Sequence, residues 1–205
     1  MAGLFNQPRQ QFSPREKLLS NYHTARVNLL FMAILTLINV VMILLGQDSY
    51  FLFSACVPYI IALTGAIFCG TLPEEYYGEI EGYHQIFESS AIYVFAAVAL
   101  AIIALYVICF VFSKKRAGFL IAALVLFSLD TVFMFYWYGL DLTMIVDILF
   151  HVWVLVYLIL GVRAYFKLKK MPTEPVPSTE EALAEEMAVA TEETAAETSE
   201  ETEEN

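Results

Sequence analysis

Five long apolar stretches decide what this chain can fold into. They lie at about residues 27–46, 51–70, 91–113, 117–138 and 143–163. A helix of about 20 apolar residues is long enough to cross the hydrocarbon core of a bilayer, which is about 30 Å thick. The chain is 59% hydrophobic and 16% charged, whereas soluble domains average about 45–50% and about 25%. The sequence therefore predicts an all-α, polytopic integral membrane protein, a bundle of about five apolar helices.

The beginning of the chain shows where this bundle starts. Residues 1–12 are polar and without pattern, and we expect them to form a disordered N-terminal segment. A helix start follows, because Ser13 is a good N-cap, Pro14 suits the first helical position and Glu16 completes a capping box. The transmembrane helical domain is accordingly expected over residues 13–170.

The net charge of −11 belongs to the remaining segment, residues 171–205. Twelve of the 22 acidic residues lie there without any Lys or Arg, so that residues 1–170 hold 11 basic and 10 acidic groups. This tail has no aromatic residue and is rich in Glu, Thr, Ala and Pro. It cannot bury enough apolar area to offset the entropy of ordering, so we expect a disordered acidic cytoplasmic tail. The balance of charge does not favour nucleic-acid binding.

The basic residues predict the orientation of the helices, because Lys and Arg collect in cytoplasmic loops. Lys114–Arg116 and Arg163–Lys170 are separated by two apolar stretches, so both clusters can be cytoplasmic, and the C-terminus with them. The length of the stretch 51–70 favours five crossings, which would leave the basic N-terminal residues outside. If 51–70 re-enters and returns to the same side, all 11 basic residues lie inside. An inverted molecule would place both clusters on the wrong side.

Small residues recur every four positions in the second apolar stretch. Pro58, Ala62, Ala66 and Gly70 share one helical face. Small residues at this spacing let helix backbones approach closely. A broken helix that lines a site is the second interpretation, since Pro is tolerated in membranes where neighbouring groups bond the freed carbonyl.

Three weaker candidates for a functional site lie outside the last two stretches. Asn39 is polar within the first stretch, and His84 and Glu88 are four residues apart in the acidic connection 71–90. The second half of that connection, from Tyr83, could form an interfacial helix on which His84 and Glu88 pair. An Asn inside a span is commonly a helix–helix hydrogen bond, and His84 with Glu88 lacks the further ligands of a metal site.

The strongest candidate site is a polar cluster in the fourth and fifth stretches, where an ionisable group is costly and often functional. Asp147 and His151 are four residues apart and share a helical face. The two stretches are antiparallel about a short turn, so that Asp130 falls level with His151, and Asp147 about one turn away. Asp130, Asp147 and His151 could therefore form a structural clasp, a proton- or ion-coupled site, or a metal-assisted catalytic site.

The function predicted from these residues is that of a small multi-pass membrane protein without a recognisable catalytic motif. We expect a transport component, or an accessory or scaffold subunit, with the polar cluster in its interior. Its predicted partners are the lipid bilayer and a protein, bound either in the membrane or at the acidic tail. The alternative is a membrane-embedded hydrolase that uses Asp130, Asp147 and His151. The sequence shows no CxxC, HExxH or phosphate-binding motif, so no cofactor and no metal is predicted. The small size of the chain and the lack of targeting signals and of cysteine-rich external loops suggest a bacterial plasma membrane.

Overall fold

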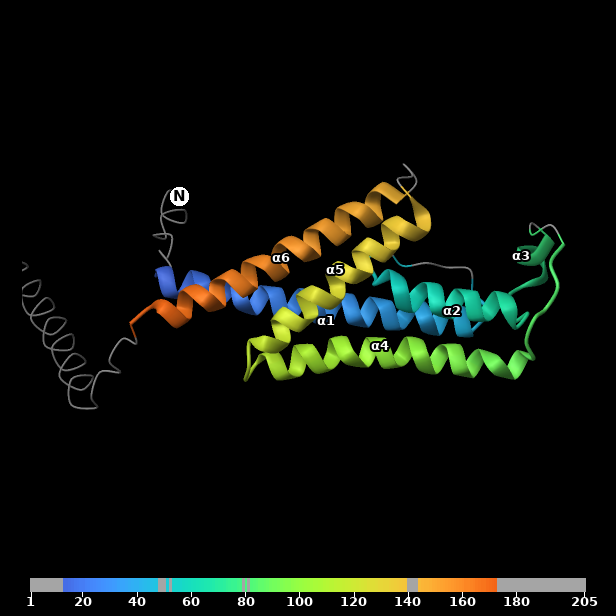
Figure 1. Ribbon diagram of the computed structural model, residues 1–205, viewed down its shortest axis with the longest axis horizontal. Coiled ribbons are helices and arrows are strands. Elements are labelled where there is room, and N and C mark those ends of the chain that lie inside the picture. The colour runs from blue at the N-terminus through green and yellow to red at the C-terminus, as the bar shows by residue number, and fades with distance from the viewer. Residues whose placement is uncertain are drawn as a thin grey trace, which may run out of the picture. The chain divides into compact units, whose positions relative to one another are not determined.

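Within the part of the chain that the structure describes, four helices are long and apolar enough to cross a membrane. They are α1 (Pro14–Leu44), α4 (Ile92–Ser113), α5 (Gly118–Tyr138) and α6 (Ile145–Lys170). The computed structural model describes residues 13–47, 51, 53–78, 80, 82–139 and 144–172. With the shorter apolar helix α2 (Cys56–Phe68), five apolar helices confirm the predicted fold class (Figure 1). The segments 1–12 and 173–205, for which we predict disorder, lie outside the described residues.

Helix α1 begins where the sequence predicts. The Ser13 hydroxyl accepts a hydrogen bond from the Glu16 amide at 3.2 Å, and the Glu16 carboxylate accepts one from the Ser13 amide at 2.7 Å. This capping box bonds two amides that the helix itself leaves without partners. Pro14 occupies the first turn, where its missing N–H costs nothing. The capping box is therefore confirmed, and α1 runs from it to Leu44.

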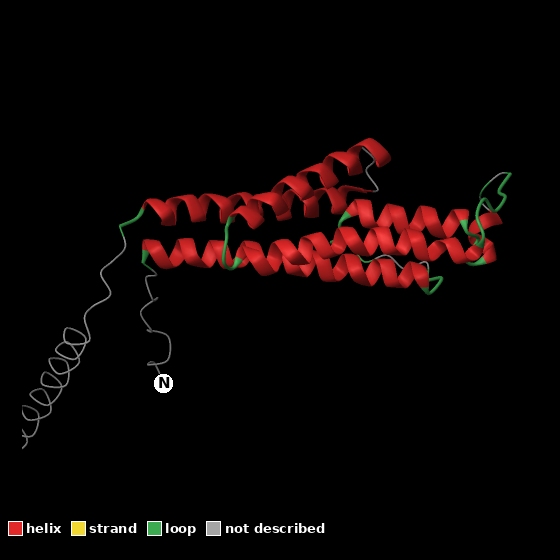
Figure 2. Ribbon diagram, turned by 60° about the horizontal axis from the view of Figure 1, so that its bottom comes forward, coloured by secondary structure: helices red, strands yellow, loops and turns green. Residues whose placement is uncertain are grey.

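The long helices alternate in direction, so the first turns of α1 lie beside the end of α4 (Figures 1 and 2). The Tyr22 hydroxyl donates to the Ser113 carbonyl at 2.6 Å, and Arg26 donates to the Ser113 hydroxyl at 2.8 Å and to the Phe110 carbonyl at 3.2 Å. Tyr22 and Arg26 thus bond two of the last carbonyls of α4, and the positive charge of Arg26 is favourable beside the negative end of this helix. We call this end of the bundle, with the start of α1, the α4–α5 turn and the end of α6, the basic end. It holds every described Lys and Arg: Arg15, Lys17, Arg26, Lys114, Lys115, Arg116, Arg163, Lys167, Lys169 and Lys170.

Helix α2 starts inside the bundle and ends beside the end of α1. Its 13 residues rise about 20 Å, less than the thickness of a hydrocarbon core. Residues of its second half form one buried cluster with Val40 and Ile43 near the end of α1. The stretch 51–70 therefore departs from the opposite end of the bundle and returns to it.

The small face of α2 is packed as its spacing predicts. Pro58, Ala62 and Ala66 are buried. Gly65 approaches α4 so closely that a Cβ there would overlap the side chain of Phe95. Close packing against α1 and α4 thus holds the body of α2.

The connection between α2 and α4 corrects one expectation. It contains the short helix α3 (Glu74–Gly78) and the 3-10 turn η1 (Ser89–Ala91), whereas residues 83–88 are not helical. The predicted interfacial helix is therefore wrong. Its residues instead bond the end of α2: the Ile86 and Phe87 amides both donate to the Phe68 carbonyl at 3.0 Å, and the Tyr83 hydroxyl donates to the Ile67 carbonyl at 2.9 Å. The loop follows this path because its groups bond the last carbonyls of α2, which have no partners within the helix.

The closest approach between α1 and α6 gives a test of this packing. A Cβ on Gly161 would overlap the Cβ of Ala25, so Gly161→Ala should destabilise the bundle by about 1–3 kcal/mol. Thermal unfolding in detergent measures this loss, and Ala25→Gly should restore much of it in the double variant. Gly118→Ala is the control, because no atom lies within 4 Å of the added carbon. Equal melting temperatures for both glycine variants would contradict the described contact of α1 with α6.

Candidate functional site at the start of α2

The chain enters the bundle along α1 before α2 begins. The Asn39 side chain, fully buried on α1, donates to the Phe51 carbonyl at 2.7 Å and accepts from the Phe51 amide at 2.8 Å. It also donates to the Ser54 hydroxyl at 2.9 Å. One carboxamide thus supplies both a donor and an acceptor to the backbone, as a neighbouring strand would. Asn39 therefore holds the entering segment, a role that the sequence could not specify.

The backbone is strained where it turns into α2. Phe53 has a φ of 74°, which is unfavourable for a bulky side chain. Its ring packs edge-on against the ring of Phe150 on α6, with centroids 4.7 Å apart. Such strain persists only where surrounding contacts impose it. The turn is thus held by contacts with both α1 and α6.

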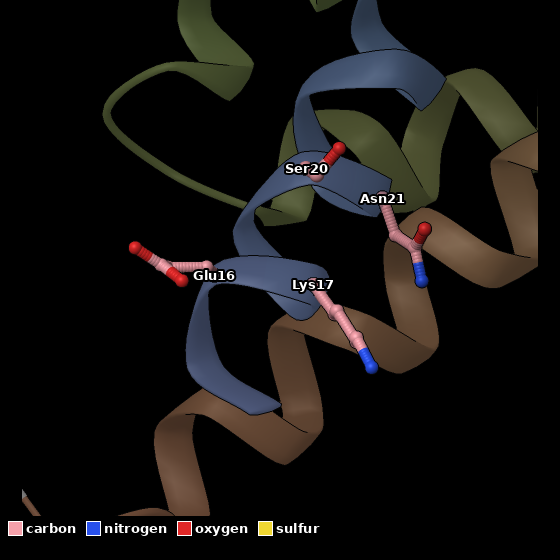
Figure 3. Close-up of a pocket in the computed structure, with 4 residues that line it drawn as sticks. All are labelled: Glu16, Lys17, Ser20 and Asn21. Carbon is pink, nitrogen blue, oxygen red and sulfur yellow. The ribbon is translucent and has the colours of Figure 1, made fainter. Parts of the chain in front are cut away.

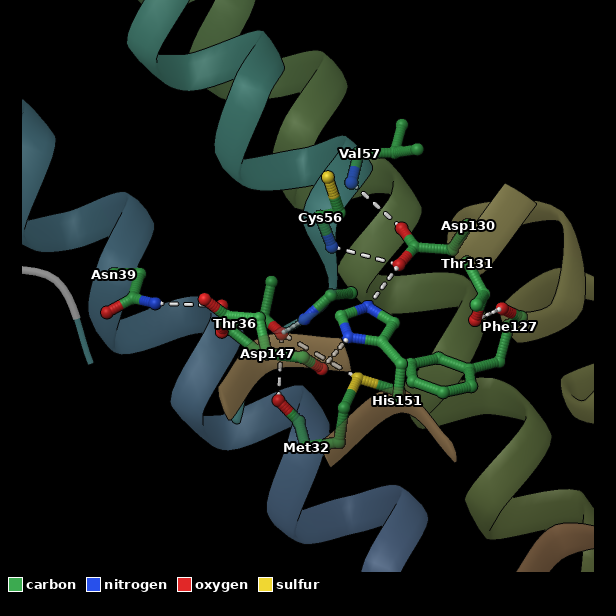
Figure 4. A network of polar contacts seen from close by, with 12 residues as sticks. Met32, Thr36, Asn39, Cys56, Val57, Phe127, Asp130, Thr131, Asp147 and His151 are labelled. Atoms are coloured by element: carbon green, nitrogen blue, oxygen red, sulfur yellow. Dashed lines mark hydrogen bonds and ion pairs between the residues drawn. The ribbon is translucent and has the colours of Figure 1, made fainter. Parts of the chain in front are cut away.

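The first amides of α2 find their partners on other helices. Ala55 is the N-cap of α2, and the helix opens with Cys56, Val57 and Pro58. The Ala55 amide donates to the Thr36 hydroxyl on α1 at 2.8 Å, and the Cys56 and Val57 amides donate to the two oxygens of the Asp130 carboxylate on α5 at 2.9 and 2.8 Å. Pro58 has no amide hydrogen to place. Because Ala55 offers no capping side chain, Asp130 and Thr36 serve as the cap of α2 (Figure 4).

His151 on α6 completes the site. Its Nε2 lies 3.3 Å from an Asp130 carboxylate oxygen, and its Nδ1 lies 2.8 Å from the Asp147 carbonyl oxygen. The imidazole also stacks on the Phe127 ring, with centroids 5.1 Å apart. Asp130 is 3% exposed and His151 is 1% exposed. An acid–imidazole pair is therefore enclosed at the point where α1, α2, α5 and α6 meet.

The predicted residues thus fall into two groups. Asp130 and His151 are in contact, and Asp147, buried in the first turn of α6, reaches His151 through its backbone carbonyl. Asn39 lies next to this cluster. His84 and Glu88 are exposed, and the His84 ring contacts the Gly82 carbonyl at 3.2 Å, so this pair is not part of the site.

Sequence reasoning missed the partners on α1 and α2. Thr36 and the amides of Cys56 and Val57 carry no distinctive pattern, since two of the three are backbone groups. The useful signal was Pro58: a proline fits the first turn of a helix, so that the helix had to begin just before it.

A cavity of about 230 Å³ lies elsewhere, at the basic end of the bundle. It is lined by Glu16, Lys17, Ser20 and Asn21 of α1 and lies where α1 passes α6 (Figure 3). None of these residues belongs to the polar cluster. Among the described residues, no three His, Cys, Asp or Glu side chains are grouped so that they could hold a metal ion.

Comparison with known proteins adds no family. No protein-family model, no curated protein and no solved structure matches the chain. The geometry at the start of α2 is therefore the basis for the functional proposal.

A comparison of two buried threonines, Thr36 and Thr131, tests whether Thr36 caps α2. Thr36 and Thr131 each donate to the carbonyl four residues earlier at 2.8 Å, but only Thr36 also accepts an amide of the entering segment. Thr36→Val should therefore cost about 1–3 kcal/mol more than Thr131→Val, because it leaves the Ala55 amide buried without a partner. Chemical denaturation in detergent measures both. Similar losses would show that Thr36 does not cap α2.

The acid–imidazole pair gives a second test. Asp130→Leu should cost about 3–5 kcal/mol, because it leaves two amides and an imidazole unpaired. His151→Leu should cost less, since the carboxylate keeps its two amide donors. The double variant should lose less than the sum of the single losses, because both remove the same contact. Melting temperatures of the four proteins complete the cycle, with Leu129→Ala on the exposed face of α5 as control; strictly additive losses would contradict the pairing.

Proposed function

We propose that this chain is a transport component of the cell membrane, with α2 as a re-entrant half-helix that moves during its cycle. One observation carries the proposal: α2 begins inside the bundle, and an ionisable side chain from another helix binds its first amides. Non-helical backbone at membrane depth is tolerated where it is buried in protein or lines a cavity. Discontinuous helices of this kind form the binding sites of many transporters.

The proposed orientation follows from the charges. The four long helices cross the bilayer, and α2 enters and leaves on one side. The basic end, which holds every described Lys and Arg, then lies in the cytoplasm, as the distribution of basic residues in membrane proteins favours. This places both ends of the chain inside and the acidic connection 71–90 outside. The start of α2 faces the outer half of the bundle.

The contacts of α2 suggest why it could move. Its start is held by a few hydrogen bonds that backbone amides donate to Thr36 and Asp130. The strained backbone at Phe53 opposes this position of α2. Small residues line its packed face, so few interlocking side chains of α2 itself would have to be withdrawn from that face. Release of a few polar contacts would therefore open the site towards the outer side.

A second candidate is an accessory or scaffold subunit, in which the same cluster is a permanent clasp. Its support is the closure of the site: Asp130 and His151 are almost without exposed surface, and each has its hydrogen-bonding partners. The two candidates differ in whether water ever reaches the start of α2. A metal-assisted hydrolase gains no support from the geometry, because the described donors do not form a metal-binding group.

Cys56 reports directly on this difference. The chain has three cysteines, so Cys69→Ala/Cys109→Ala leaves Cys56 alone, and Cys56→Ala/Cys69→Ala leaves Cys109, which is equally buried. In vesicles with the acidic connection outside, an impermeant maleimide should label Cys56 at about 0.1–10% of the rate of an exposed thiol, the usual population of a minor open state. Leu45→Cys, in a protein lacking the native cysteines, provides that exposed reference.

Cys109 should react more slowly than Cys56, because it lies in α4 away from the proposed opening. Labelling of Cys56 no faster than that of Cys109 would show that the site stays closed. That result would overturn the transport proposal in favour of the accessory or scaffold subunit.

A further inference from the structure

The hydrogen bonds of His151 fix where its ring protons lie. A carbonyl oxygen can only accept, so the Nδ1 that lies 2.8 Å from the Asp147 carbonyl carries a hydrogen. This assignment rests on the partner of the nitrogen, as imidazole tautomers generally do. In a neutral ring, Nε2 would then hold a lone pair directed at the Asp130 carboxylate.

The contact between the two side chains therefore needs one more proton. The carboxylate oxygen nearest to Nε2 already accepts the Cys56 amide, and two lone pairs facing each other at 3.3 Å repel. One proton between them removes the conflict, either as imidazolium donating to carboxylate or as carboxylic acid donating to neutral imidazole. In both forms the pair carries no net charge, which is the least costly state in an apolar interior.

We propose that Asp130 and His151 form a proton-binding site that controls α2: one shared proton keeps the start of α2 docked, and a second proton, taken from water on the outer side, releases it. The inference rests on the proposed function, because it names the proton as the coupling ion of the same site.

The effect of the second proton follows from the groups that it changes. With both side chains protonated, Asp130 becomes a neutral acid, and hydrogen bonds from the Cys56 and Val57 amides to a neutral acceptor are weaker than those to a carboxylate. The pair also gains a positive charge next to the positive end of the α2 dipole. Both changes weaken the docking of α2, so acidification should open the site.

Among the described residues, no Lys or Arg lies near the pair to balance the charge of the Asp130 carboxylate. The titratable groups that act on Asp130 are the Cys56 thiol of α2 and the Tyr106 phenol of α4. The Asp147 carboxyl of α6 and the Tyr138 phenol of α5 act in turn on Cys56. Helix α1 contributes Thr36 and Asn39, which do not titrate, and every described Lys and Arg lies at the basic end. The shared proton is thus the nearest available positive charge for Asp130.

Nuclear magnetic resonance can count the protons on the pair. His23 and His84 are exposed, so His23→Gln/His84→Gln leaves His151 as the only histidine of the three. With ¹⁵N-histidine and ¹³C-aspartate labels at neutral pH, we expect Nδ1–H together with either a protonated Nε2 or a protonated Asp130 carboxyl. A neutral imidazole next to an ionised Asp130 would overturn the proposal.

The release of α2 is measured with Cys56 as the only cysteine. Its maleimide rate is divided at each pH by the rate of the Leu45→Cys reference, because the thiolate is the nucleophile and its fraction falls with pH in both proteins. This ratio should rise about tenfold from about pH 8 to about pH 4.5, which corresponds to the loss of about 1.4 kcal/mol of docking. Asp130→Asn/His151→Gln, which leaves neither member of the pair able to bind a proton, should make this ratio independent of pH. Glu88→Gln, which removes an exposed carboxyl, should leave the rise unchanged.

The outcomes separate this inference from the proposed function. If Cys56 reacts faster than Cys109 at every pH without a rise in acid, the transport proposal stands and the proton site is wrong. If Cys56 is as unreactive as Cys109 at neutral and acid pH, both fail. A rise that persists in Asp130→Asn/His151→Gln would assign the opening to another group and would also overturn the proton site.

Discussion

The arrangement of this bundle depends on the amides that begin α2. A helix that starts in an apolar interior leaves its first N–H groups without partners, and each costs several kcal/mol if water cannot reach it. Here the partners come from Thr36 on α1 and Asp130 on α5, while Pro58 removes one requirement. His151 on α6 then bonds Asp130. The long helices α1, α5 and α6 therefore place polar side chains at the same level of the bundle, where those of α1 and α5 bond the first amides of the shorter helix α2.

The two ends of α2 are satisfied in different ways. At its end, the backbone amides of Ile86 and Phe87 and the hydroxyl of Tyr83 bond the last carbonyls, and these groups belong to a connecting loop. At its start, the partners are side chains on long helices, and the preceding turn is strained at Phe53. Loop contacts can follow a moving helix, whereas a bond to a side chain on a fixed helix must break. The start of α2 is therefore the place where movement would be controlled.

Much of this architecture could be predicted from the sequence, but the site only in part. The apolar stretches, the capping box at Ser13 and the common depth of Asp130 and His151 follow from periodicity and helical rise, which are local properties. The approach of the chain to α2 does not follow from such local properties. It depends on the contacts of Asn39 with Phe51 and of Thr36 with Ala55, which join residues twelve or more positions apart in the sequence. The loop from Tyr83 was predicted as an interfacial helix because its amphipathic pattern is local, while the α2 carbonyls that compete for it are not.

The chain itself offers a comparison that favours a proton-linked role for Asp130. Asn39 bonds the Phe51 amide and carbonyl with a neutral carboxamide, so the fold can hold an entering backbone without any ionisable group. The start of α2, a few residues later, is instead held by a carboxylate that lies against an imidazole, and a buried carboxylate is costly unless its charge is balanced. A permanent clasp needs no such arrangement, since neutral hydrogen-bonding groups such as Thr36 and Asn39 hold the neighbouring backbone. What the acid–imidazole pair adds is a contact whose strength changes when a proton binds or leaves, and this is the property that a moving half-helix requires.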